Sequence, residues 1–319
     1  MKYMFSKLNI CWIIATTLLL SILTIAMQGG IINLYYQSTL YTIGINIILA
    51  VSLNLIIGVT GQFSLGHAGF MCIGAYAAAI ITKSNPTIVG FMMAVVIGAL
   101  ISAVVALIVA IPTLRLKGDY LAIATLGFSE IVRIVVLNMK VTNGAAGLFG
   151  IPKLTTWPLL VVCIIITMLV VLNFSRSAPG RACISIREDE IASEAMGINT
   201  TKYKTIAFVI GAMLAALAGC LYACNFYVVK PDLFTWARSV DILILVVFGG
   251  MGSFTGSVVA AIVIGFINMF LAQFSDIRMI IYGAALVLIM VFRPQGIFGT
   301  KEFTFSAIFE WLRKKKEAK

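Results

Sequence analysis

Charged side chains are scarce in this chain. Only 11% of its 319 residues are Asp, Glu, Lys or Arg, whereas 61% are hydrophobic, and the mean hydropathy is +1.07. Apolar runs of about 15 to 24 residues recur along the chain, and a helix needs roughly 20 residues to cross a bilayer core. Segments that alternate at period two are absent, which excludes a membrane barrel. The one class left open is an all-α polytopic membrane protein.

The chain also lacks the motifs of an enzyme. No G-x-x-x-x-G-K-[ST] stretch occurs, so the chain has no P-loop to cradle ATP. The single histidine, His67, has no second metal ligand at helical spacing, and no nucleophile–base pair is visible. Five of the six cysteines lie in apolar runs and the sixth, Cys183, lies in a polar segment, so they form no disulfide framework. We expect no catalytic residue, no metal and no cofactor.

Ten apolar runs are predicted to cross the membrane. The third and the eighth are short for a bilayer core, and each adjoins a glycine-rich break without charge. The ten runs are residues 10–27, 39–58, 68–82, 88–111, 120–138, 158–174, 205–226, 240–250, 256–274 and 278–292.

The distribution of basic residues gives an orientation. With ten crossings and the N-terminus inside, sixteen of the 23 basic residues fall on the cytoplasmic side, six fall outside and Arg133 lies within the membrane. Both termini are then cytoplasmic. Because the formal charge of +11 follows membrane topology, we do not take it as a sign of nucleic-acid binding.

The longest polar segment lies at residues 173–204. Pro179 and Gly180 break the preceding helix, and residues 187–196 read as one short helix with acidic first turns. Gly197 follows at the position of a left-handed C-cap. This segment is either a solvated loop or, as we favour, a helix that docks in the groove of a soluble partner. The predicted docking residues are Arg187, Glu188, Asp189, Glu190, Ile191, Glu194, Ala195 and Gly197.

Two glycine-rich breaks interrupt the apolar runs, at residues 58–69 and 248–257. Irregular backbone at membrane depth persists only where protein or a wet cavity satisfies its amides. Gln62, Ser64 and His67 supply hydrogen bonds in the first break. They either line a transport path or simply tie a turn to a neighbouring helix, and close packing at glycines accounts for both breaks without a substrate.

The fifth run carries two charges near mid-membrane. Glu130 and Arg133 are three residues apart, so they share a helix face and can pair. Charges at this depth usually face the bundle interior or a water-filled path. The pair is either a neutralised structural contact or part of the path.

Six stretches together resemble one family, the permease subunits of bacterial ATP-binding-cassette importers for branched-chain amino acids, in their larger, second-permease branch. The likeness covers roughly residues 40–299, and it is specific as a set. The stretches are LNLIIGVTGQFSLGHAGFMCIGAYAAA, LKGDYLAIATLGFSEIVRIVV, TNGAAGLFGIP, GRACISIREDEIASEAMGINTTKYKTIAFVIGA, VVFGGMGSFTGSVVAA and RPQGIFG.

The resemblance implies an assembly in the bacterial inner membrane. Its expected members are a second permease subunit, two cytoplasmic ATPases and an extracytoplasmic solute-binding protein. Within it, Glu194-Ala195-Met196-Gly197 nearly matches the loop that the ATPase grips, with Met196 as a conservative departure. Importers of urea and other amides have similar permeases, and a self-sufficient secondary transporter with Glu130 as ion site is the alternative from another class.

The expected division of the chain follows from these features. A first helix and outer loop (1–38) precede a permease core (39–299), which contains the cytoplasmic coupling loop (175–204) and is followed by a basic tail (300–319).

Overall fold

The computed structural model describes residues 33–113, 116, 118–271, 283, 296 and 299. The predicted crossing at 10–27 and the basic tail lie outside these residues, as does the crossing at 278–292 apart from Gly283. The α-helices are α2 Leu34–Asn54, α3 His67–Ser84, α4 Ile88–Thr113, α5 Asp119–Asn138, α6 Trp157–Arg176, α7 Ala178–Glu188, α8 Glu190–Ala195, α9 Thr200–Phe226, α10 Trp236–Gly249 and α11 Phe254–Leu271. The other elements are the π-helical turn η1 Leu55–Val59, the 3₁₀ turns η2 Gly144–Ala146 and η3 Pro231–Phe234, and the strands β1 Leu148–Phe149 and β2 Val228–Val229.

The chain is an all-α polytopic membrane protein. Each predicted run within the described residues is helical. Five spans there are long and apolar enough to cross a membrane: α2 with η1, α4, α5, α6 and α9. The helices α10 and α11 meet at 118°, and together they make a sixth candidate span if they count as one broken unit.

Helix α4 shows why these helices pack as they do. Small side chains let helix backbones approach closely in a membrane, where apolar side chains gain little from avoiding lipid. The buried face of α4 carries a small residue at every fourth position: Ala94, Gly98, Ser102 and Ala106. The exposed face carries large apolar residues at the same spacing: Met92, Val96, Leu100, Val104 and Ile108. The first set packs on α3 and α9, and the second set lies on the outer face of the bundle.

The interior of the bundle is formed by α2, α3 and α9. A side chain at Gly74 of α3 would overlap with the backbone carbonyl of Ala216 in α9, so the close contact of these two helices requires glycine there. Ser102 of α4 donates to the carbonyl oxygen of Ala212 (2.9 Å) and fastens α4 to the same helix. Helix α9 is therefore the element on which its neighbours are assembled.

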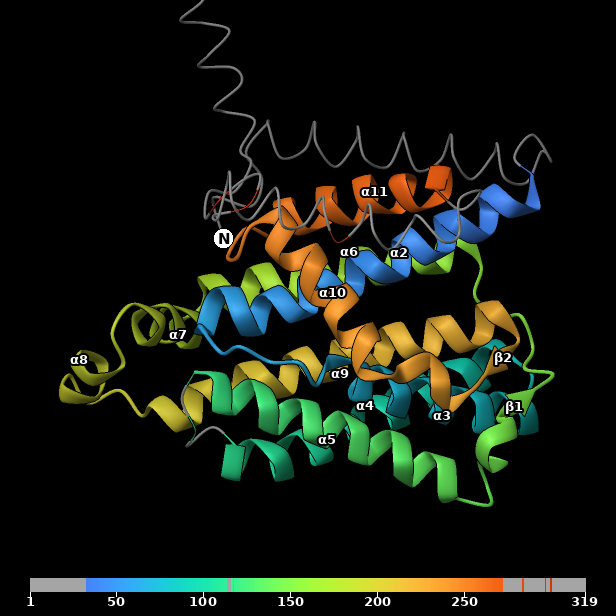
Figure 1. The fold of residues 1–319 in the computed structure, drawn as a ribbon, viewed down its shortest axis with the longest axis horizontal. Coiled ribbons are helices and arrows are strands. Elements are labelled where there is room, and N and C mark those ends of the chain that lie inside the picture. Colours follow the sequence, from blue (N-terminus) through green and yellow to red (C-terminus); the bar gives the residue numbers. More distant parts are fainter. Residues whose placement is uncertain are drawn as a thin grey trace, which may run out of the picture.

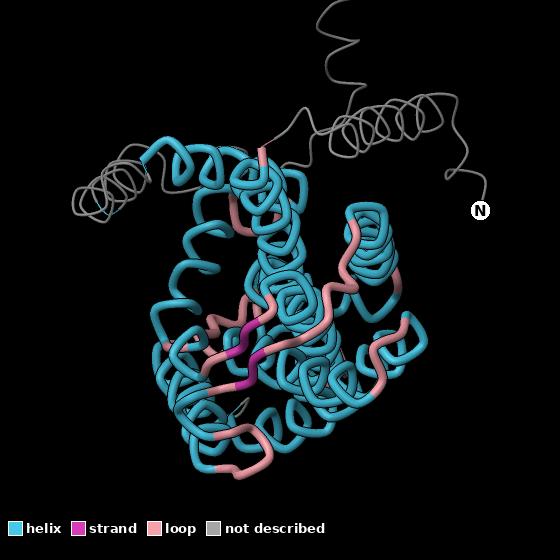
Figure 2. Tube along the Cα trace, turned by 90° about the vertical axis from the view of Figure 1, so that its right-hand side faces the viewer, coloured by secondary structure: helices cyan, strands magenta, loops and turns pink. Residues whose placement is uncertain are grey.

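The two ends of the bundle carry different structures. Figure 1 shows α7 and α8 projecting at one end, and β1 and β2 at the opposite end. The strands pair antiparallel, Leu148 with Val229 and Phe149 with Val228, and they face the viewer in Figure 2. We call these the α7–α8 end and the sheet end. The sequence had not predicted the small sheet.

Candidate coupling and translocation site

The polar segment forms two helices, so the prediction of a single helix over residues 187–196 was wrong. Helix α7 begins earlier, with Ser177 as N-cap accepting from the amide of Gly180 (3.3 Å) and Pro179 in its first turn. Pro179 and Gly180 therefore lie in the first turn of α7, just after the end of α6. Asp189 then interrupts the run, because it adopts an extended conformation and accepts from the amide of Ala192 (3.0 Å) as N-cap of α8.

The predicted glycine stop is confirmed. Gly197 has a φ of +83°, in the left-handed region. The amide of Gly197 donates to the carbonyl of Glu194 (2.9 Å), and the amide of Ile198 donates to that of Ser193 (3.0 Å). These two bonds form a Schellman motif, which satisfies the last carbonyls of α8 and gives the helix a defined end.

Helix α8 is fastened to both neighbouring helices. The Lys204 ammonium on α9 donates to Glu190 (2.6 Å), and the Thr200 hydroxyl at the start of α9 donates to Glu194 (2.7 Å). The hydroxyls of Ser185 on α7 and Ser193 on α8 lie 2.8 Å apart. A displacement of α8 would therefore move the end of α9, the central helix of the bundle.

The surface that α8 leaves open is apolar. Ile191 is 75% exposed and Met196 is 82% exposed, with Ala195 also exposed beside them. Ile198, which follows the C-cap, is half-buried. Glu190 and one carboxylate oxygen of the exposed Glu194 bond to α9, and the apolar groups left to contact another molecule are chiefly Ile191, Ala195 and Met196.

Arg187, at the end of α7, reaches the first glycine-rich break. Its guanidinium donates to the carbonyl oxygen of Gly58 (2.6 Å) and pairs with Glu188 (2.5 Å). Its aliphatic stem lies against Gly61. The α7–α8 segment and the first break, which are more than 120 positions apart in sequence, are thus in direct contact.

Asn54 joins the first break to the second. Its side-chain oxygen accepts from the amide of Gly252 (2.8 Å), and its amide nitrogen donates to the carbonyl of Ser253 and the hydroxyl of Ser257 (both 2.8 Å). Asn54 is fully buried. A side chain at Gly58 would overlap with Gly252, so the two breaks pack backbone to backbone.

The polar residues of the first break lie in the interior. His67 is buried, and one ring nitrogen lies 2.8 Å from the Ser52 hydroxyl of α2. Ser64 accepts from the amide of Gly66 (3.4 Å). Gln62 is buried, and both polar atoms of its side chain are without a hydrogen-bond partner among the described residues. His67 ties α3 to a neighbouring helix, and Gln62 remains a polar group that a water or a solute could satisfy.

Glu130 and Arg133 pair as the spacing predicts. The Arg133 guanidinium donates to Glu130 (2.7 Å), and both side chains are 22% exposed. The other oxygen of Glu130 accepts from the backbone amide of Trp236 (3.0 Å), at the start of α10. The pair therefore holds α10 against α5, and the carboxylate occupies a helix N-terminus, where negative charge is favoured.

The sequence matches a known family. A model described as the branched-chain amino acid transport system / permease component matches residues 35–290. The chain belongs to this permease family. No solved structure matches the chain.

Individual members of the family are similar to this permease over most of its length. LivM, the high-affinity branched-chain amino acid transport system permease protein of Salmonella typhimurium, is 34% identical over 72% of this chain and 61% of its own length. The LivM protein of Escherichia coli gives the same values. LivH of Salmonella typhimurium is 27% identical over 62% of this chain and 65% of its own length. The permease spans about three fifths of the length of its LivM relatives.

Several residues of this site had no signal in the sequence. Asn54 lies inside an apolar run, and only its contacts with the second break mark it. In the sequence, Lys204 and Thr200 belong to the end of a charged loop, whereas in the structure they hydrogen-bond to Glu190 and Glu194 of α8. Among the permease residues predicted from the sequence, Arg187 lies next to the first break, and Glu130 and Arg133 lie at the start of α10.

Proposed function

We propose that this chain is the transmembrane permease subunit of an ATP-binding-cassette importer, and that it forms part of the translocation path for branched-chain amino acids. The observation that carries the proposal is the α7–α8 element. It exposes Ile191 and Met196 at one end of the bundle, and it is hydrogen-bonded both to α9 and to the first glycine-rich break. An apolar helix surface of this kind suits the groove of a partner protein.

The proposed partner at α8 is a cytoplasmic ATPase. Movement imposed there has two routes into the bundle. One runs through Glu190 and Lys204 into α9, and the other runs through Arg187 and Gly58 to Asn54 and the second break. Short hydrogen-bonded links transmit displacement better than a solvated loop would.

The other proposed partners are a second permease subunit, a second ATPase and an extracytoplasmic binding protein that supplies the solute. Similarity to proteins named LivM and LivH, both permease proteins of high-affinity branched-chain amino acid transport, supports a pair of related permease chains. In the proposed orientation the chain crosses the bacterial inner membrane ten times, with both termini and the α7–α8 end in the cytoplasm. This orientation follows from the basic residues.

The contacts of Glu130 weigh against a self-sufficient secondary transporter. A proton or ion site needs a carboxylate that can exchange its partner, whereas Glu130 accepts from both Arg133 and the amide of Trp236. A structural role accounts for both contacts. The test of function is ATP-driven uptake.

The experiment reconstitutes the chain with its neighbouring permease, ATPase and binding protein in proteoliposomes. We expect accumulation of leucine, isoleucine and valine that requires enclosed ATP and the binding protein. Accumulation by the chain alone, without ATP, would identify a secondary transporter. Accumulation of urea in place of leucine would reassign the solute.

A further inference from the structure

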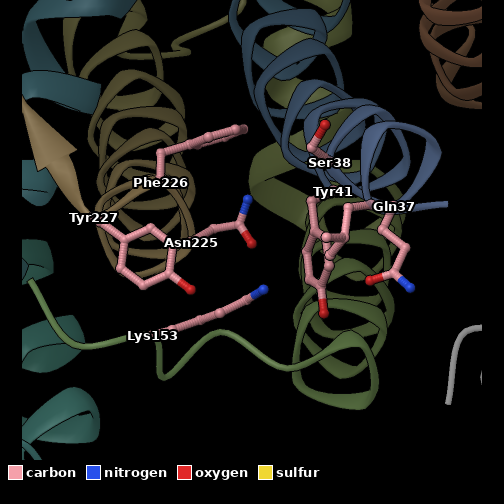
Figure 3. Close-up of a pocket in the computed structure, with 8 residues that line it drawn as sticks. Gln37, Ser38, Tyr41, Lys153, Asn225, Phe226 and Tyr227 are labelled. Carbon is pink, nitrogen blue, oxygen red and sulfur yellow. The ribbon is translucent and has the colours of Figure 1, made fainter. Parts of the chain in front are cut away.

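A small pocket lies at the sheet end, opposite α8. It has a volume of about 240 Å³, somewhat below the range of about 300–1,000 Å³ that drug-sized ligands occupy, so it suits a solute of amino-acid size. Figure 3 shows its residues converging from the start of α2, the end of α9 and the loop before α6. Five of the residues that line it are Tyr41, Lys153, Asn225, Phe226 and Tyr227.

The ammonium of Lys153 has no acidic partner at the pocket among the described residues. The Lys153 ammonium lies 5.7 Å from the ring centre of Tyr41 and 6.0 Å from that of Tyr227. None of the ion pairs of the described residues involves Lys153, and no acidic residue lines the pocket. Lys153 and Tyr227 are both exposed at the mouth of the pocket. An ammonium that lies between aromatic rings and has no carboxylate partner favours an anionic group beside it.

A buried amide points into the same space. Asn225 is 6% exposed, yet its side-chain amide makes no hydrogen bond to another described residue. In Figure 3 this amide points into the space beside Tyr41, close to the end of the Lys153 side chain. The residue as a whole is buried, whereas its amide atoms open onto the pocket and can bond a group there. The amide and the ammonium together offer donors to one carboxylate.

The backbone around the pocket is held in place. Tyr227 has a φ of +62°, a conformation that a bulky residue rarely adopts and that tends to occur at functional positions. Its carbonyl accepts from the amide of Ile151 (3.3 Å), next to the pairing of β1 with β2. The sheet thus holds the Lys153 loop beside Tyr227. The ring of Trp157 packs edge-on against Tyr41, with ring centres 5.7 Å apart.

We propose that this pocket binds a free α-amino acid with an apolar side chain, before the solute enters the path. Its carboxylate would accept from Lys153 and Asn225, and its side chain would pack on the rings of Phe226 and Tyr41. This proposal rests on the proposed function for the choice of solute, and it adds a binding site at the end of the bundle away from the ATPases. A small recessed pocket suits a free solute better than an acidic loop of a binding protein.

The test measures binding without transport. The assembled permease–ATPase complex, in lipid nanodiscs and without the binding protein, is titrated with L-leucine and with L-leucinamide, which lacks the carboxylate. We expect wild type to prefer leucine, and Lys153→Met to weaken leucine binding about ten-fold or more while leaving leucinamide unchanged, because a charge-assisted bond is lost. Lys153→Arg should restore most of the preference, and Asn225→Ala should weaken it.

Lys140→Met is the matched control, since Lys140 is an exposed lysine in the loop after α5 and does not line the pocket. Equal binding of leucine and leucinamide by wild type would overturn the proposal. A second result would also overturn it: Lys153→Met keeps its leucine binding but no longer captures the binding protein. Lys153 would then be a contact for that protein. ATP-driven uptake by wild type is measured separately, so failure of the importer assignment is distinguishable from failure of the pocket.

Discussion

Polar side chains inside this bundle link helices to one another. His67 lies against Ser52, Glu130 accepts from the start of α10, and Asn54 joins two backbone breaks. Each link satisfies backbone or hydroxyl groups that lipid could not satisfy, which is why irregular backbone persists here. Among them, Asn54 uses both polar atoms of its side chain on a single neighbouring segment.

Replacement of Asn54 by leucine tests this role. The change keeps the approximate volume but leaves the amide of Gly252 without the partner it has now, whereas the carbonyl of Ser253 still accepts from the amide and hydroxyl of Ser257. Because an unsatisfied amide costs about 1–3 kcal/mol, we expect a lower midpoint of thermal unfolding for the purified chain and reduced ATP-driven uptake. The control is Asn138→Leu, at an exposed residue at the end of α5. If the two variants unfold at the same temperature, the link between the breaks contributes nothing.

At the scale of elements, α8 depends on its ends and its anchors. A helix of six residues has little stability of its own. The Asp189 cap, the Schellman motif at Gly197 and the bonds to α7 and α9 give it a fixed position. These contacts hold the exposed Ile191 and Met196 in a defined place, which a docking surface requires.

Gly197 offers a clean test of this element. A side chain there would meet no atom within 4 Å, so the only penalty of a substitution is the left-handed backbone. That penalty is roughly 1–2 kcal/mol for an ordinary residue and smaller for asparagine. We expect Gly197→Val to lower solute uptake and retention of the ATPase, with Gly197→Asn close to wild type; both are read from uptake and co-purification. Wild-type coupling in Gly197→Val would show that α8 is only a solvated turn.

For the whole molecule, the asymmetry of basic residues sets the proposed orientation. Cys183 is a poor reporter of it, since the thiol is fully buried and burial raises its pKa to about 11. A thiol reacts as the thiolate, so at neutral pH Cys183 is almost wholly unreactive, and its alkylation should increase only as the pH rises towards 11. An exposed position is needed instead.

We expect Met196→Cys, in a chain with Cys11 replaced by serine, to react with an impermeant maleimide only from the cytoplasmic face. Met196 is 82% exposed, and Cys72, Cys163, Cys183, Cys220 and Cys224 are all buried, so background labelling should be low. Lys140→Cys, in a loop assigned to the opposite face, should react only from outside. Labelling of Met196→Cys in intact cells would reverse the orientation.

The sequence by itself determined the class of protein, the positions of the apolar helices in the described part of the chain and several local features. The length of an apolar run, the glycine at a left-handed position and the three-residue spacing of Glu130 and Arg133 are local properties, and the structure agrees with each. The prediction of one helix across residues 187–196 was wrong for a local reason too. Aspartate is favoured at a helix N-cap over a helix interior, and Asp189 caps α8.

Only the tertiary structure decided which distant groups meet. Asn54 and Ser253 are 199 positions apart, and Lys153 lies beside Tyr227 only because β1 pairs with β2. Neither the 118° angle between α10 and α11 nor the contact of Arg187 with Gly58 can be read from the apolar runs. Periodicity says which residues share a helix face. The packing of small residues, such as Gly74 against α9, decides which helix that face meets and at what depth.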